Sequence, residues 1–122
     1  MGKKLTIADI LERKKVIKPL ELKFYSETLG GEIDIKKISP DKIFELAQDI
    51  QTNRYTAFCK VIYASCPIFQ SRELHEQFKP VEPFEIVDIV FGTNLAEISI
   101  LANQIFTLYG MGQPVDVNEV KK

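Results

Sequence analysis

The sequence predicts one mainly helical α+β domain, with an N-terminal β-hairpin packed against about five helices. The length of 122 residues fits a single domain. Apolar and polar side chains alternate on both sides of Gly30-Gly31, the pattern of a half-buried hairpin. Apolar side chains then recur three and four residues apart through much of residues 39–110, the pattern of amphipathic helices. We expect residues 1–112 to form the domain and residues 113–122 to form a flexible tail.

Residues 1–18 are predicted to contain a short helix. Thr6 and Asp9 stand three residues apart, as the two partners of a capping box do. A short apolar stripe follows, formed by Ile7, Ile10 and Leu11. Pro19 is expected to end the helix, because proline cannot continue one.

Residues 19–38 are predicted to form the hairpin. Leu20, Leu22 and Phe24 alternate with polar or amphipathic residues before Gly30-Gly31, and the alternation resumes after it. Two glycines in succession suit the positive φ angles of a tight turn. Because an isolated two-stranded hairpin is marginally stable in water, helices must cover one of its faces.

Five further helices are expected after the hairpin, and punctuation residues mark their ends. Ser39 and Pro40 are typical of an N-cap and a first helical residue. The periodicity of 84–91 also fits a buried strand, but Pro83 before the run and Gly92 after it favour a helix. The five segments are 39–50, 55–66, 71–78, 84–91 and 94–109.

Charge and composition exclude some classes of protein. The net charge is −1 and 45% of residues are hydrophobic, which argues against a strongly basic nucleic-acid coat and against disorder. Residues 1–23 nevertheless carry seven basic and three acidic side chains, whereas residues 24–122 carry nine and fourteen. A solvated helix end explains the basic segment most simply. The alternative is a small regulatory or nucleic-acid-binding module that uses this segment.

The cysteines and the histidine do not form a recognisable catalytic or metal site. Cys59 and Cys66 lie on one predicted helix with their Cα atoms about 10 Å apart, too far for a disulfide. We expect both to be buried apolar residues in a reducing compartment. His75 lies in a polar stretch and is expected on the surface, without a partner at zinc-site spacing. Neither glycine cluster matches a nucleotide-binding motif, so no cofactor is expected.

Three carboxylates, those of Glu82, Glu85 and Asp88, cluster near the start of a predicted helix. Carboxylates at this position complement the helix dipole, which is their ordinary role. Acid–base catalysis by Glu85 and Asp88 is the enzymatic alternative. The sequence therefore predicts a protein that is not an enzyme.

Residues 84–109 carry a dense apolar load, and the last helix is apolar on nearly all sides. Such a helix is typical of a buried centre. It also suits a surface for a partner's amphipathic helix, or for self-association. The two interpretations can hold for different faces.

Landmarks spread over residues 5–112 resemble, in their order, the XkdN-like tail assembly chaperones of long-tailed phages and prophages of Gram-positive bacteria. The resemblance is carried by Leu5-Thr6-Ile7-Ala8-Asp9-Ile10-Leu11, Leu29-Gly30-Gly31-Glu32-Ile33, Tyr63-Ala64-Ser65-Cys66-Pro67, Ser71-Arg72-Glu73-Leu74, Pro83-Phe84-Glu85-Ile86-Val87-Asp88-Ile89-Val90-Phe91, Ala96-Glu97-Ile98-Ser99-Ile100 and Leu108-Tyr109-Gly110.

This resemblance implies a non-enzymatic role in the cytoplasm of the bacterial host. Proteins of this family bind the long, helix-rich tape measure protein, keep it soluble, help recruit tail tube protein around it and leave the finished particle. No membrane partner is implied. We expect the client to be bound by apolar side chains of the dense segment, namely Phe84, Val87, Phe91, Leu101, Ile105 and Leu108.

Overall fold

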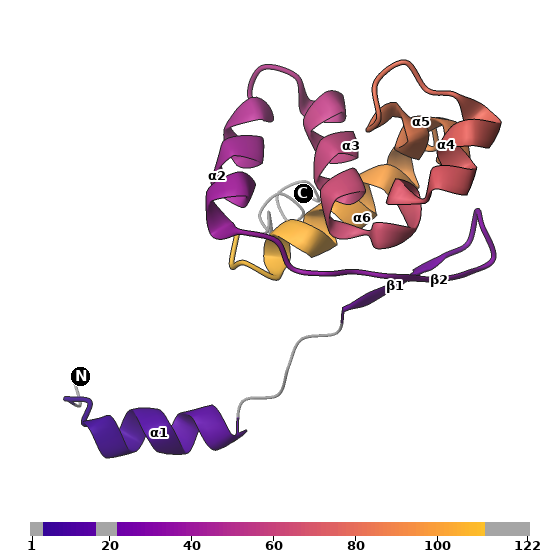
Figure 1. The fold of residues 1–122 in the computed structure, drawn as a ribbon. Coiled ribbons are helices and arrows are strands. Elements are labelled where there is room, and N and C mark those ends of the chain that lie inside the picture. The colour runs from indigo at the N-terminus through magenta and orange to yellow at the C-terminus, as the bar shows by residue number, and fades with distance from the viewer. Residues whose placement is uncertain (1–3, 17–21, 112–122) are drawn as a thin grey trace, which may run out of the picture.

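The computed structural model describes residues 4–16 and 22–111 (Figure 1). Its described part is mainly helical with one antiparallel hairpin, which confirms the predicted α+β class. The elements are α1 (Ile7–Val16), β1 (Lys23–Ser26), β2 (Gly31–Asp34), α2 (Pro40–Asp49), α3 (Arg54–Ser65), the 3-10 turn η1 (Pro67–Gln70), α4 (Arg72–Phe78), α5 (Glu85–Phe91) and α6 (Leu95–Thr107).

Helix α1 begins with the predicted capping box. The Thr6 amide donates to Asp9 Oδ2 at 3.0 Å, and the Asp9 amide donates to Thr6 Oγ1 at 3.1 Å. The apolar side chains near its start are 54–75% exposed; they are Leu5, Ile7, Ile10 and Leu11. Pro19 and the predicted C-terminal end of this helix lie outside the described residues, as does the predicted tail.

The hairpin is shorter than the alternation predicts. Phe24 pairs with Ile33 across the two strands, and both side chains are buried. The turn is formed by residues 27–30, so Gly31 belongs to β2 and only Gly30, with a φ of 74°, adopts the left-handed conformation. The predicted turn at Gly30-Gly31 is therefore displaced, because the Gly30 amide closes a wider turn on the Ser26 carbonyl at 2.8 Å.

The helix ends agree with their predicted signals. Ser39 caps α2 by accepting from the Asp41 amide at 3.1 Å. The segment open to a strand interpretation is helix α5, which ends at Gly92 with a φ of 63°. Asn94 caps α6 by accepting from the Glu97 amide at 3.1 Å.

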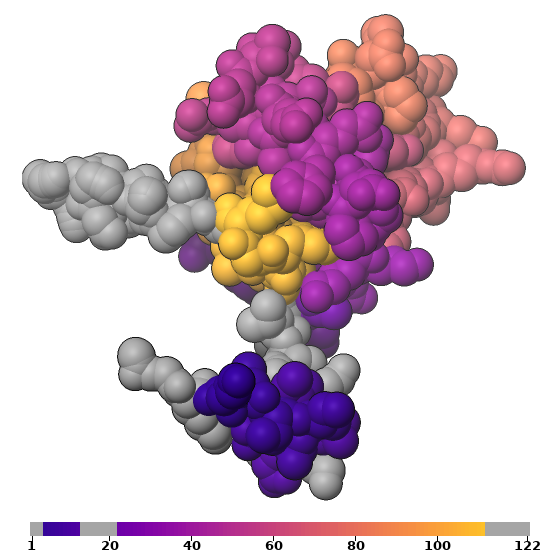
Figure 2. Space-filling model, turned by 90° about the vertical axis from the view of Figure 1, so that its left-hand side faces the viewer, coloured from indigo at the N-terminus to yellow at the C-terminus, as the bar shows by residue number. Residues whose placement is uncertain are grey.

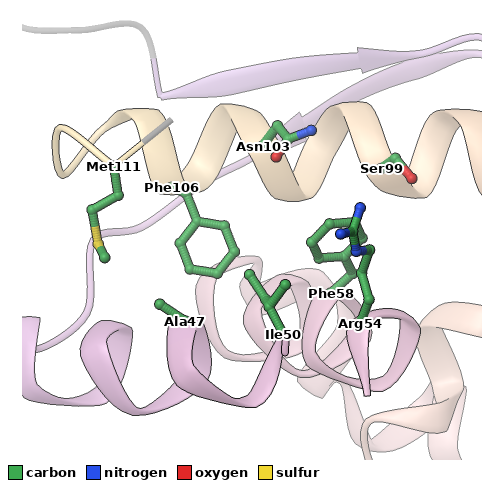
Figure 3. A pocket seen from close by; sticks show the side chains of 8 residues that line it. All are labelled: Ala47, Ile50, Arg54, Phe58, Ser99, Asn103, Phe106 and Met111. Atoms are coloured by element: carbon green, nitrogen blue, oxygen red, sulfur yellow. The ribbon is translucent and has the colours of Figure 1, made fainter. Parts of the chain in front are cut away.

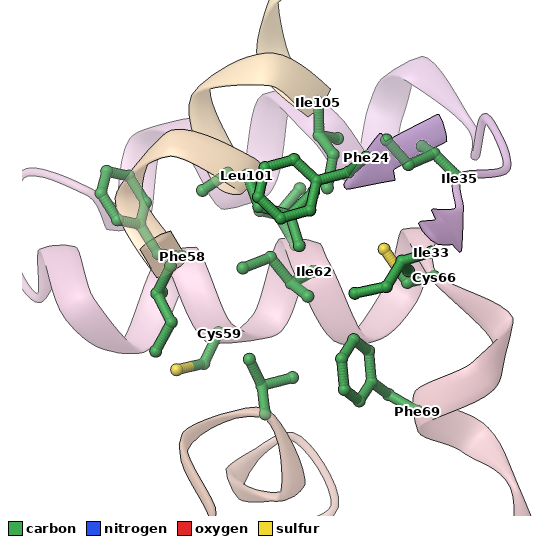
Figure 4. Packing of buried hydrophobic residues seen from close by; sticks show 14 of the residues in the cluster. Phe24, Ile33, Ile35, Phe58, Cys59, Ile62, Cys66, Phe69, Leu101 and Ile105 are labelled. Atoms are coloured by element: carbon green, nitrogen blue, oxygen red, sulfur yellow. The ribbon is translucent and has the colours of Figure 1, made fainter. Parts of the chain in front are cut away.

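Helix α3 occupies the centre of the core and contacts α2, α5, α6 and η1. Figure 4 shows Ile62 of α3 facing the side chains of Phe24 and Leu101, and Cys66, which follows α3, beside Ile33 of the hairpin. Helices thus cover the apolar face of the hairpin. This agrees with the prediction, because a two-stranded hairpin on its own is only marginally stable in water. Helix α6 is central and largely buried, as its apolar load predicts, and it packs against α3 at the centre of the core.

Candidate functional site

A hollow of about 560 Å³ lies between α2, the start of α3 and α6, and we call it the α2–α6 groove. Figure 2 shows the face on which α2 and the C-terminal part of α6 lie side by side, and Figure 3 shows the groove from close by. It is lined by Ala47, Ile50, Arg54, Phe58, Ser99, Asn103, Phe106 and Met111.

The groove has an apolar floor and a polar rim. Phe58 and Phe106 are 7% and 3% exposed and belong to the main core, against which Ile50 also packs. Arg54 is exposed at the rim, and within the described part of the chain no carboxylate lies at ion-pair distance from it. The groove can therefore accept apolar side chains at its floor and a carboxylate at its rim.

Two turns place the walls of the groove. After α2, the Asn53 amide donates to the Asp49 carbonyl at 2.8 Å, and this tight turn brings Arg54 close to Ile50. After α6, Gly110 has a φ of 77° and the Met111 amide donates to the Phe106 carbonyl at 3.0 Å. The chain thereby turns back, and Met111 becomes part of the groove wall.

The structure corrects most of the partner-binding side chains expected from the sequence. Five of them are at most 8% exposed and lie in the core: Val87, Phe91, Leu101, Ile105 and Leu108. Their helices use these faces to pack together with α3, so the side chains are not accessible to a partner in this conformation. Phe84 alone is half-buried, with Lys60 Nζ 5.3 Å from its ring centroid.

The two cysteines are buried free thiols, as predicted. Burial raises the pKa of Cys59 to about 11 and that of Cys66 to about 12. Because the thiolate is the nucleophile and the metal ligand, neither side chain suits those roles at neutral pH. Among the described residues no group of three His, Cys, Asp or Glu side chains could hold a metal ion.

His75 is not the solvated surface residue that its polar surroundings predict. It is half-buried, its Nε2 lies 2.9 Å from the Phe69 carbonyl oxygen, and its ring meets the Tyr63 ring edge-on. These contacts attach α4 to the turn before it, which gives His75 a packing role.

The three carboxylates near the start of α5 do not all face solvent either. Asp88 Oδ1 accepts hydrogen bonds from the Tyr55 hydroxyl and, at 2.9 Å, from Thr93 Oγ1. Burial, together with the hydrogen bond to Asp88, raises the pKa of Tyr55, so its hydroxyl remains a donor. This cluster joins α3 to α5, whereas Glu82 is exposed.

Sequence reasoning missed the role of the Glu97 side chain. The residue is 9% exposed, and its carboxylate accepts hydrogen bonds from Ser26 Oγ at 2.9 Å and from the Glu27 amide at 2.8 Å. Burial alone would raise its pKa, but the hydrogen bonds outweigh burial and lower it. Asn94 and Glu97 stand three residues apart, a spacing that predicts only a local helix cap. The partners of the Glu97 carboxylate are 70 and 71 residues away in the sequence, so no local pattern reveals them.

No family model, curated protein or solved structure matches this chain. None of the described helices has both the length and the apolar character needed to cross a bilayer.

Proposed function

We propose that this protein is a tail assembly chaperone that binds apolar stripes on the helices of a phage tape measure protein. It keeps that client soluble and aids the assembly of tail tube protein around it. It acts in the cytoplasm of the bacterial host, is absent from the finished virion and catalyses no reaction. The resemblance over residues 5–112 supports the identity of the client.

The α2–α6 groove is the observation that carries the proposal. Its volume of about 560 Å³ falls within the range of roughly 300–1,000 Å³ typical of ligand pockets. An amphipathic helix docks by placing apolar side chains of one face into such a groove. Phe58 and Phe106 form a floor for these side chains, and Arg54 can pair with an acidic residue beside them.

The first helix offers a second apolar surface. Four apolar side chains at its start are exposed, from Leu5 to Leu11. The groove alone is small, so we expect each contact with the client to be weak. Several copies bound along one long client then keep it soluble through avidity. Each copy can still dissociate when the tube subunits assemble.

Co-expression tests the proposal directly. The tape measure protein encoded by the same phage or prophage genome is produced in bacteria with and without this chain. We expect it to remain in the soluble fraction only with the chain, because its exposed apolar stripes otherwise aggregate. Equal aggregation in both cultures contradicts the proposal, provided that the chain itself is soluble in the culture.

A further inference from the structure

The charge of the α2–α6 groove is confined to one of its ends. Arg54 and Ser99 lie at one end, and Phe106 and Met111 lie at the other (Figure 3). Among the described residues that line the groove, Arg54 is the one that carries a charge. The groove therefore offers an apolar floor with a cation at one end.

Arg54 stands at a position where a cation does not help the fold. It is the first residue of α3, and this helix has no acidic residue in its first turn. Asn53, the N-cap residue, makes no capping hydrogen bond through its side chain. A cation at a helix N-terminus opposes the helix dipole. Because no described carboxylate pairs with it either, the Arg54 guanidinium is available to a carboxylate from a partner.

The length of the groove sets the spacing of side chains in a bound helix. Phe106 and Ser99 are seven residues apart on α6, a distance of about 10 Å along the helix axis. Residues i and i+7 of a bound helix that lies along α6 are the same distance apart and share one face. When residue i lies at the Phe106 end, residue i+7 lies beside Arg54. The partial negative charge at the C-terminal end of a helix favours this direction.

We infer that the α2–α6 groove selects amphipathic helices in which an acidic residue follows the apolar residues on the same face. Apolar side chains at i, i+3 and i+4 contact the floor formed by Phe58 and Phe106, and a carboxylate at i+7 pairs with Arg54. Arg54 thereby determines specificity. This inference rests on the proposed function, because it describes the client helices that the groove accepts.

Three synthetic peptides with the same alanine-rich helical sequence test this selectivity. All three carry leucine at i, i+3 and i+4. The first has glutamate at i+7, the second has glutamine there, and the third has the glutamate at i+5, on another side of the helix. We expect the second and third peptides to bind about threefold more weakly than the first, as an ion pair at an exposed rim predicts. Calorimetry at low salt measures the affinities, and equal affinities or no binding overturn the inference.

Charge reversal tests whether Arg54 contacts the acidic side chain. Arg54→Glu should bind a fourth peptide, with lysine at i+7, more tightly than the peptide with glutamate. Arg72→Glu is the matched control, because Arg72 is also exposed and also begins a helix, α4, but does not line the groove. It changes the net charge equally and should keep the preference of the wild type for glutamate. The same loss of preference in both variants overturns the inference.

A stability measurement separates this role of Arg54 from a structural one. The urea midpoint of Arg54→Glu should equal or exceed that of the wild type, because a carboxylate at a helix N-terminus complements the dipole. A lower midpoint would assign Arg54 to the support of the fold and would overturn its role in selecting the client.

The peptides and the co-expression experiment fail independently of each other. If the tape measure protein aggregates but the chain discriminates among the peptides, the proposed client is wrong and the selectivity stands. If the chain keeps that protein soluble but binds all the peptides equally, the selectivity is wrong and the proposed function stands.

Discussion

Leu101→Ala is expected to lower the free energy of unfolding by about 2–5 kcal/mol, the usual range for removing a large apolar side chain from a core. Leu101 is fully buried on α6, between the hairpin and α3 (Figure 4). The substitution removes the apolar contacts of this side chain with the hairpin and α3 and leaves a cavity. Urea unfolding followed by circular dichroism measures the loss.

Ile100→Ala is the matched control for this prediction. Ile100 is the neighbouring residue on the same helix and is 58% exposed. Its truncation should change the free energy of unfolding by no more than about 0.5 kcal/mol. Equal losses for the two variants would mean that α6 does not bury the face described for it.

Glu97→Ala is expected to be the second most damaging of the proposed substitutions. It leaves the Ser26 hydroxyl and the Glu27 amide without their acceptor, and a buried unpaired donor costs about 1–3 kcal/mol. Glu73→Ala on the exposed side of α4 is the control and should have little effect. Urea unfolding of the two variants at neutral pH gives the comparison, and equal stability would contradict a structural role for the Glu97 carboxylate.

The lowered pKa of Glu97 also predicts a dependence of stability on pH. Its carboxylate is stabilised in the folded state, so this contribution is fully present above the unfolded-state pKa of about 4.5. It is lost as the pH falls through the lower, folded-state pKa. Glu97→Gln should therefore lose less stability than the wild type on acidification, and an unchanged acid dependence would contradict the assignment.

Local signals predicted the elements well because their physical causes are local. The capping box at Thr6 and the N-cap hydrogen bond at Asn94 each join residues three positions apart, and both are present. The turn of the hairpin was displaced because Ser26 accepts from the Gly30 amide, a choice that glycine content alone does not specify. Pro83 before α5 and Gly92 after it likewise predicted correctly that this segment is a helix.

The exposure of the expected partner-binding side chains was predicted poorly because the apolar pattern does not tell which side of a helix meets the core. Leu101 and Ile105 satisfy the pattern of a docking stripe, yet α3 and the hairpin cover them completely. The groove depends instead on Arg54 and on the reversal of the chain at Gly110, which brings Met111 against α2. Neither feature has a periodic signal in the sequence.

Filling the groove gives the most direct test of the account. Ser99 lines the groove, whereas Ala96 lies three residues earlier on α6 and faces a different hollow beside the hairpin. The affinity of each variant for a tape measure segment is compared with that of the wild type by calorimetry, after urea unfolding has shown that both fold. We expect Ser99→Phe to weaken binding by about tenfold or more and Ala96→Phe to leave it within about twofold. Unchanged affinity for Ser99→Phe, or a larger loss for Ala96→Phe, would contradict the claim that the α2–α6 groove binds the client.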